Sequence, residues 1–171
     1  MGELDKAEEN FHQALAINPE FAEVHSSLGD TLKELGRLDE AVICYQKAIT
    51  IDPERAGLHN NLGVVHREMG DLTEALESYR RALLIEPDYA AGHQNLGNAL
   101  LDMGKLDEAI DSFRMAVTVD PDFAEAHRFL AHIKKHTEYD QDIQALERAY
   151  AKPGVNDEQK MHLCFGLERR A

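Results

Sequence analysis

Four histidines recur along the chain at intervals of 34 residues, within the segments HSSLG, HNNLG, HQNLG and HRFLA. They are His25, His59, His93 and His127. Histidine can bind a metal ion or move a proton, so the pattern raises the question of a metal site or a catalytic array. Residues that share a zinc ion must each bring an atom within about 2 Å of it. Packed helices lie about 8 to 10 Å apart, and one repeat contains two such steps. The spacing therefore disfavours a shared metal or a catalytic site and predicts no cofactor. It favours histidines wedged between helices, with ring nitrogens bonded to neighbouring backbone or water.

These histidines belong to an internal repeat of 34 residues, which is visible when 22–55, 56–89 and 90–123 are aligned. Small or apolar residues recur in the same register in all three segments. The recurring sets are Leu28, Leu62 and Leu96; Gly29, Gly63 and Gly97; Ala41, Ala75 and Ala109; Tyr45, Tyr79 and Phe113; Ala48, Ala82 and Ala116; and Pro53, Pro87 and Pro121. A repeat of this length indicates a supersecondary unit that must stack on its neighbours to bury its apolar face.

The proline and glycine residues within each repeat predict two helices joined by a tight turn. Asn18-Pro19 and its counterparts should cap and begin the first helix, because proline is favourable at the first helical position. Gly36, Gly70 and Gly104 should end that helix as left-handed glycines. The small residue of Leu-Gly should lie where the two helices of a pair cross, and the aromatic residue should fill the space toward the neighbouring unit.

The pattern of Leu-Gly, downstream Ala, aromatic, Ala and Pro resembles the tetratricopeptide repeat over about residues 1–137. The resemblance implies an all-α fold, a right-handed superhelical solenoid of stacked antiparallel helix pairs with a concave surface. It divides the chain into a half repeat that supplies only a second helix, three full repeats, a degenerate repeat and a C-terminal capping helix. The respective ranges are 1–21; 22–55, 56–89 and 90–123; 124–151; and 152–171.

The resemblance also implies that the first helices turn a polar face toward a bound peptide. One family precedent is a clamp of cationic and amide side chains that grips a peptide carboxylate, but at its positions this chain matches only with Asn61. Another is the asparagine ladder of O-linked N-acetylglucosamine transferase, to which Asn61 and Asn95 are similar. An amide can pair with any peptide backbone because it carries both a donor and an acceptor. We therefore expect peptide contacts from Asn60, Asn61, Gln94, Asn95 and Asn98, with Ser27 in the same register and Lys33 and Arg67 at the edges. The alternative is that the asparagines only solvate an exposed helix face.

Composition narrows the classes of partner. The formal net charge is −14, and 32 acidic residues outnumber 18 basic ones, which disfavours nucleic acid. No apolar run approaches the length of a membrane span, and the N-terminal sequence MGELDKAEEN has no secretory signal pattern, so we expect a cytoplasmic protein with no membrane insertion. Cys44 and Cys164 match no metal-ligand spacing. The function predicted from these features is a non-enzymatic scaffold that binds an extended protein or peptide segment in a concave groove.

The two ends of the sequence suggest two alternatives to a peptide-binding scaffold. The first expected helix has no partner helix before it, so Leu4, Phe11 and Leu15 should form an apolar contact surface. Self-association through this surface, as a homo-oligomer, would make the protein a structural module. Residues 124–171 are similar to the segment that joins repeats to a sulfotransferase-like domain in some bacterial proteins, which would make the chain a regulatory fragment of a larger enzyme.

Overall fold

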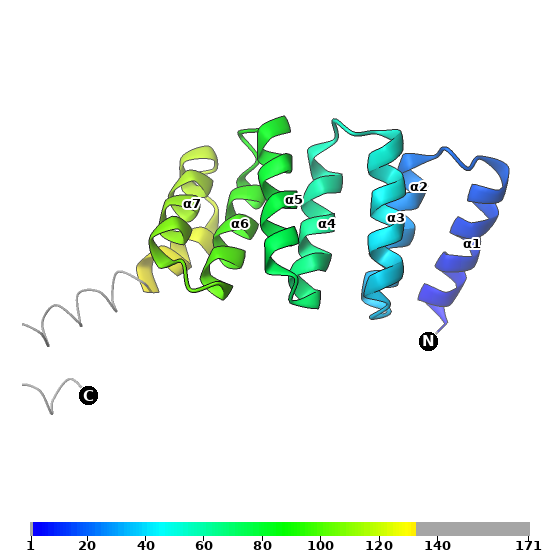
Figure 1. Cartoon of the computed structure of the whole chain (residues 1–171), viewed down its shortest axis with the longest axis horizontal. Helices are drawn as coiled ribbons and strands as arrows, with labels where there is room; N and C mark the ends of the chain where they lie inside the picture. Colours follow the sequence, from blue (N-terminus) through cyan, green and yellow to red (C-terminus); the bar gives the residue numbers. More distant parts are fainter. Residues whose placement is uncertain (1, 133–171) are drawn as a thin grey trace, which may run out of the picture. The chain divides into compact units, whose positions relative to one another are not determined.

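The computed structural model describes residues 2–132 of the chain, and all of its regular structure there is helical. Figure 1 shows the helices side by side in chain order. They are α1 (Glu3–Ile17), α2 (Ala22–Glu34), α3 (Leu38–Ile51), α4 (Ala56–Met69), α5 (Leu72–Ile85), α6 (Ala90–Asp102) and α7 (Leu106–Val119). A further helix begins at residue 124. The expected capping helix, Cys164 and most of the degenerate repeat lie outside the described residues.

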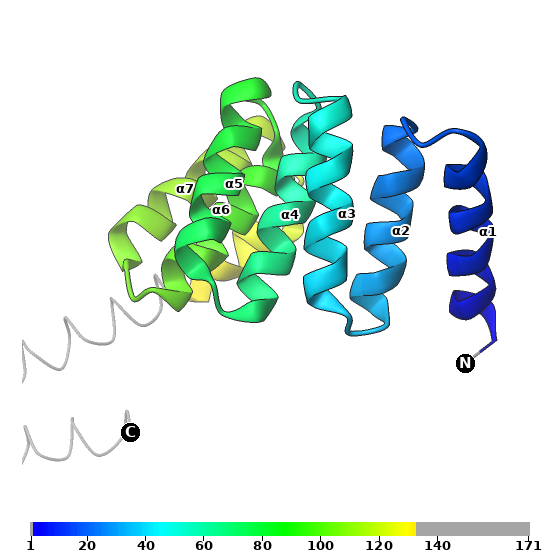
Figure 2. The same ribbon diagram turned by 45° about the vertical axis from the view of Figure 1, so that its right-hand side comes forward.

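Residues 1–126 form one compact unit, in which consecutive helices pack on each other. The most extensive packing joins α2 to α3, α4 to α5 and α6 to α7. These three pairs then stack through α3 on α4 and α5 on α6, and α4 also contacts α6 directly (Figure 2). We call α2, α4 and α6 the first helices of their pairs, and α3, α5 and α7 the second helices. The predicted solenoid of stacked helix pairs is confirmed.

The turns within the pairs form at the predicted glycines. Gly36, Gly70 and Gly104 have φ angles of 75°, 87° and 75°, in the left-handed region that residues with a Cβ rarely adopt. The Arg37 backbone N–H donates to Leu32 O at 2.9 Å, which closes the end of α2. Each turn therefore satisfies the last carbonyl groups of a first helix before the second helix begins.

The expected helix start at Asn18-Pro19 and its counterparts is wrong. Asn18 is the C-terminal cap of α1, and Asp120 is the C-terminal cap of α7. The helix that follows begins four residues after each cap, at Ala22 after Asn18 and at residue 124 after Asp120. The Asn18 side chain accepts from the Glu20 backbone N–H at 3.2 Å, and Asp120 accepts from Asp122 in the same way at 3.0 Å. The side chain and the proline therefore shape a turn between repeats, because an Asn or Asp side chain readily bonds the backbone two residues on.

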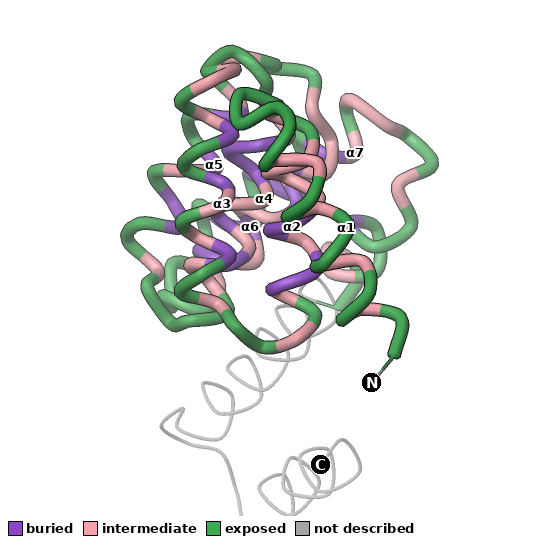
Figure 3. The backbone as a smooth tube through the Cα atoms, turned by 90° about the vertical axis from the view of Figure 1, so that its right-hand side faces the viewer, coloured by how far each residue is buried: buried purple, intermediate pink, exposed green. Residues whose placement is uncertain are grey.

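Each pair of helices closes on a contact between glycine and an aromatic ring. A Cβ added to Gly63 would lie 2.7 Å from Tyr79 Cε1, and one added to Gly97 would lie 2.8 Å from Phe113 Cε1. Tyr79 and Phe113 are completely buried. Each ring therefore fills the space that a missing side chain leaves within its own pair. Tyr45 also belongs to one buried cluster with Val65 of the next pair, in agreement with the prediction that the aromatic residue fills space toward the neighbouring unit. Figure 3 shows buried segments within the helices and exposed turns between them.

Candidate functional site

The recurring histidines tie each first helix to the turn that precedes it. The Nε2 atoms of His25, His59 and His93 lie 2.8, 2.9 and 2.8 Å from the carbonyl oxygens of Pro19, Pro53 and Pro87 respectively. Because a carbonyl oxygen can only accept, each Nε2 must carry the proton and donate it. The prediction of structural histidines bonded to neighbouring backbone is confirmed for these three. Among residues 2–132, no group of three or more His, Cys, Asp or Glu side chains is arranged to hold a metal ion.

The contact between Gly63 and Tyr79 fixes which way each side of α4 faces. Successive residues of a helix are rotated by about 100°, so Asn61, Val64 and Glu68 lie roughly 100° to 160° around the helix from Gly63. Asn61 and Glu68 therefore face away from the second helix α5, and Val64 lies at the boundary between the two sides of α4. We define the first-helix face as these positions and their equivalents: Glu23, Ser27, Asp30 and Glu34 on α2; Gly57, Asn61, Val64 and Glu68 on α4; and Ala91, Asn95, Asn98 and Asp102 on α6.

Two of the predicted contact residues are packed between successive first helices. Asn60 is 5% exposed, and its Oδ1 accepts from Asn95 Nδ2 of α6 at 2.9 Å. Gln94 is 7% exposed, and its Nε2 donates to the Glu125 carboxylate at the start of the next helix. We call these positions the seam amides. Their hydrogen bonds hold neighbouring repeats in register. Because they are buried, the seam amides are less accessible to a ligand than the amides of the first-helix face.

The amides of the first-helix face are half-buried. Asn61, Asn95 and Asn98 retain intermediate exposure, and so does Ser27 in the same register as Asn61 and Asn95. Asn61 is joined to the seam amides only by a 3.5 Å contact from Asn60 Nδ2 to its Oδ1. One Nδ2 hydrogen of Asn95 is used by Asn60, which leaves its other hydrogen and its carbonyl oxygen without a bond within the described residues. These amides can therefore offer both donors and acceptors while the seam amides hold their helices in place.

The two predicted edge cations differ in their surroundings. Arg67 Nε donates to Asp102 Oδ2 at 2.6 Å, which links the ends of α4 and α6. Lys33 makes no ion pair within the described part of the chain and is half-buried on α2. Arg67 is therefore committed to holding two repeats together, and Lys33 is the cation that remains open to other contacts.

One polar pair beneath the first-helix face was not predicted. Tyr45 is completely buried, and its hydroxyl donates to Asp30 Oδ1 at 2.6 Å. Tyr79 is the equivalent residue one repeat later, but Val64 stands where Asp30 does, and the buried Tyr79 hydroxyl has no partner within the described residues. Burial is the main cause that raises the pKa of both phenols, and the bond to Asp30 adds to it for Tyr45. In the sequence, the only sign of this difference between the two tyrosines is that equivalent positions of the repeat hold Asp30 and Val64.

The apolar residues expected on α1 are only half-covered. Phe11 and Leu15 pack against the core cluster that includes Leu28 and Leu32 of α2, so they are not a free surface as a whole. Nevertheless Phe11 keeps intermediate exposure, whereas its counterparts in the repeat, Tyr45 and Tyr79, are completely buried. Leu4 also keeps intermediate exposure and does not belong to the core cluster. Within the described residues, one side of α1 is therefore covered by α2, and its other side is not covered.

Comparison of the sequence with protein families gives matches along most of the chain. A family described as TPR repeat matches residues 1–36 and 29–70, and families described as Tetratricopeptide repeat match residues 54–122 and 95–156. None of the curated protein sequences matches the chain. Within the described residues, no helix has both the length and the apolar character needed to cross a membrane.

Solved structures share the fold at low sequence identity. A crystal structure of MamA superimposes with a TM-score of 0.73 at 23% identity and covers 80% of each chain. A second MamA structure has a TM-score of 0.71 at 18% identity and covers 99% of this chain and 81% of its own. The first TPR of Spaghetti (RPAP3) bound to the HSP90 peptide SRMEEVD has a TM-score of 0.64 at 24% identity and covers 68% of this chain and 93% of its own. These likenesses extend the agreement from sequence pattern to three-dimensional arrangement.

Proposed function

Because the chain is built from tetratricopeptide repeats, an architecture typical of non-enzymatic protein interaction, we propose that it binds an extended peptide segment of another protein along the first-helix face. The observation that carries this proposal is the pairing of two kinds of amide. Seam amides tie successive first helices together, and beside them Asn61, Asn95 and Asn98 keep hydrogen-bonding groups half-exposed. A row of rigidly placed amides can bond a peptide backbone whatever its side chains are.

Support also comes from the unused hydrogen-bonding groups of Asn61 and Asn98. Within the described residues, their side chains make no hydrogen bond other than the 3.5 Å contact from Asn60 to Asn61. An amide that only had to solvate the surface would function equally well as serine or glutamine. We therefore assign Asn61 and Asn95 as backbone contacts, with Asn98 and Ser27 extending the same row. We assign Asn60 and Gln94 as the residues that position them, and Lys33 and Arg67 as flanking groups.

Replacing Asn61 and Asn95 together by alanine tests this function. We expect the affinity for a bound peptide to fall about tenfold, because each lost hydrogen bond contributes roughly 0.5 to 1.5 kcal/mol. The measurement is titration of the full chain with a fluorescent peptide, with circular dichroism to show that the helices remain. Gln46→Ala provides the control, since Gln46 is an exposed amide on the second helix α3. Unchanged affinity in the double variant would remove these residues from the site.

A second candidate function is self-association through the open side of α1. The observation that favours it is the incomplete burial of Phe11, whose counterparts Tyr45 and Tyr79 are fully covered. Since Phe11 and Leu15 also contact the core, a charge there would disturb folding, so Leu4→Glu is the cleaner variant. We expect Leu4→Glu to reduce the molar mass measured by light scattering at high concentration to that of one chain. Gln13→Glu places the same charge at an exposed position of α1 and should not do so. A single-chain mass for the unaltered protein would exclude this function.

A further inference from the structure

The charged residues of the first-helix face are all acidic. They are Glu23, Asp30, Glu34, Glu68 and Asp102. The lysine and arginine residues of α2, α4 and α6 are Lys33 and Arg67, and both lie outside this face, about 40° around their helices from Gly29 and Gly63 respectively. Arg67 is already neutralised by Asp102 at 2.6 Å. The surface proposed to meet the peptide therefore carries an excess of negative charge.

Three of these acids form a row at the C-terminal ends of successive first helices. Glu34, Glu68 and Asp102 are exposed and lie 34 residues apart, so each repeat contributes one carboxylate at the same height. The C-terminus of a helix already carries partial negative charge, and an acidic side chain there is unfavourable for the helix itself. Glu34 and Glu68 make no ion pair within the described residues that would compensate. Glu34 and Glu68 of this carboxylate row therefore do not serve helix stability.

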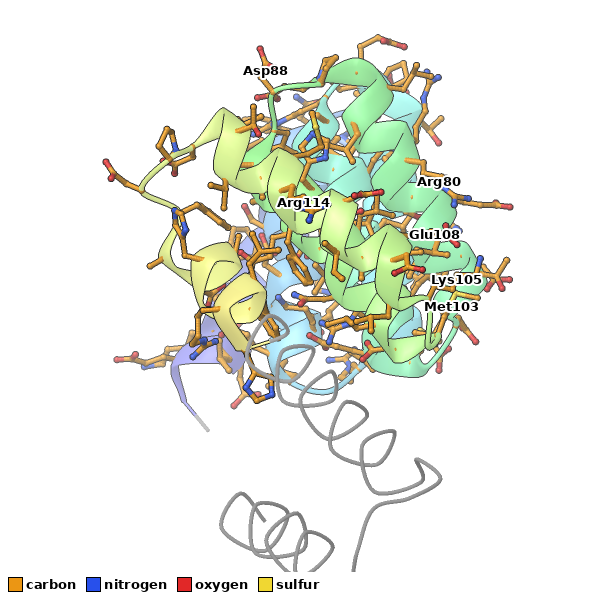
Figure 4. All side chains as sticks on the ribbon, turned by 90° about the vertical axis from the view of Figure 1, so that its left-hand side faces the viewer. Arg80, Asp88, Met103, Lys105, Glu108 and Arg114 are labelled. Atoms are coloured by element: carbon orange, nitrogen blue, oxygen red, sulfur yellow. The ribbon has the colours of Figure 1, made fainter. Side chains whose placement is uncertain are left out.

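Basic side chains are placed elsewhere in the unit. Figure 4 shows Arg80 on α5 and Arg114 on α7 at the outer surface of the second helices, with Lys105 beside Glu108. The Lys105 Nζ atom lies 3.7 Å from Glu108 Oε1, and Arg114 lies 3.2 Å from Asp111. The second helices α3, α5 and α7 also carry more acids than cations, seven against four, but cations are present among them. The first-helix face carries acids alone.

A buried acceptor on α6 also lacks a donor. Gln94 is 7% exposed, and its Oε1 accepts no hydrogen bond within the described part of the chain. Its Nε2 is directed to the Glu125 carboxylate, so two acceptor groups, Gln94 Oε1 and Glu125, adjoin each other with a single donor between them. A buried acceptor left without a donor is costly. A guanidinium or ammonium group arriving beside Glu125 would supply donors that residues 2–132 do not.

From this arrangement we propose that the bound partner is a basic extended peptide whose lysine or arginine side chains recur at every third residue and meet the carboxylate row. The inference rests on the function proposed above and names the chemistry of its partner. The successive first helices α4 and α6 contact each other directly, so their axes lie one packing step of about 8 to 10 Å apart, and not the two steps expected from the repeat. An extended chain advances about 3.3 Å per residue, so three residues span about 10 Å. Side chains three residues apart therefore reach successive carboxylates while the backbone follows the asparagines.

Peptides of matched length test the charge and the spacing separately. The probe is a fluorescent ten-residue peptide with lysine at positions 1, 4, 7 and 10 and with serine and alanine between them, titrated into the full chain. We expect it to bind about tenfold more tightly than the same peptide with glutamate in place of lysine. It should also bind several-fold more tightly than a peptide in which the four lysines are consecutive. Equal affinity for the lysine and glutamate peptides would overturn the proposal, and equal affinity for the two lysine peptides would overturn the spacing.

Variants of the chain show whether the carboxylate row is responsible. Glu34→Gln with Glu68→Gln should weaken the regularly spaced lysine peptide about tenfold. Asp39→Asn with Glu77→Gln changes the net charge equally, at exposed residues of the second helices α3 and α5, and should weaken it less than about twofold. Equal losses in both variants would mean that only the overall charge matters and would contradict the row.

A peptide with glutamine in place of lysine separates this inference from the proposed function. If the glutamine and lysine peptides bind equally, and Asn61→Ala with Asn95→Ala weakens both, the peptide-binding function stands and the preference for a basic partner is wrong. If the asparagine variant leaves the affinity for every peptide unchanged, the proposed function itself fails. The two ideas can therefore fail independently.

Discussion

Gly63→Ala should lower the free energy of unfolding by about 1 to 3 kcal/mol, although alanine is the better helix former. A glycine inside a helix normally costs about 0.5 to 1 kcal/mol relative to alanine, so the substitution in itself would be favourable. At Gly63, however, the new Cβ would lie 2.7 and 2.8 Å from Cε1 and Cδ1 of Tyr79. Tyr79 is completely buried and cannot move aside without displacing its neighbours. Overpacking of this kind outweighs the gain in helix propensity. Urea denaturation followed by circular dichroism measures the change.

The same helix contains the matched control. Gly57 also lies within α4, but a Cβ added there meets nothing within 4 Å. Gly57→Ala should therefore raise the free energy of unfolding by about 0.5 to 1 kcal/mol, the opposite sign from Gly63→Ala. Gly29→Ala should fall between them, because its nearest contact, with Tyr45, is 3.0 Å. If both alanine substitutions in α4 stabilised the protein, the close approach of ring and backbone would not hold the pair together.

Much of this architecture can be predicted from the sequence because it depends on local rules. Left-handed glycines such as Gly70 must end a first helix, and the 34-residue period must stack. The recurring histidines could be recognised as structural from their spacing alone. Their acceptors could not, because the bond from His59 to Pro53 O closes a turn whose shape depends on where α4 begins. The start of α4 was itself predicted too early, since proline is compatible with both a turn and a first helical position.

The candidate site was predictable in composition but not in arrangement. The sequence places Asn60 and Asn61 side by side, yet a rotation of about 100° between them directs one into the seam and the other to the open face. Only the direction in which α6 packs on α4 decides that Asn60 lies in the seam and Asn61 on the open face. The contact of Tyr79 with Gly63 within its own pair was not predicted for a similar reason, because a periodic pattern does not distinguish the two sides of a helix. The acidic row at Glu34, Glu68 and Asp102 was present in the alignment but required the face to be defined first.

Two tyrosines in equivalent positions should respond in opposite ways to the loss of the hydroxyl. Tyr45→Phe removes a 2.6 Å bond to the Asp30 carboxylate, and bonds to charged groups contribute roughly 1.5 to 3 kcal/mol. We expect a loss of about 1.5 kcal/mol, since half-buried Asp30 can recover some hydration. Tyr79→Phe removes a buried hydroxyl that has no partner within the described residues, so the free energy of unfolding should stay unchanged or rise. Phenylalanine already occupies the equivalent position in the third pair, as Phe113.

A double-mutant cycle assigns the difference to the missing acceptor. Val64→Asp restores at α4 the carboxylate that Asp30 provides at α2, but it also removes an apolar side chain. The cost of losing valine is the same whether residue 79 is tyrosine or phenylalanine, so the cycle over Val64→Asp and Tyr79→Phe isolates the new hydrogen bond. We expect a favourable coupling of about 1 kcal/mol or more between Asp and Tyr at these positions, measured by urea denaturation of the four proteins. A coupling near zero would contradict the assignment, because it would mean that the fully buried Tyr79 hydroxyl does not lie where the Tyr45 hydroxyl lies in the preceding repeat.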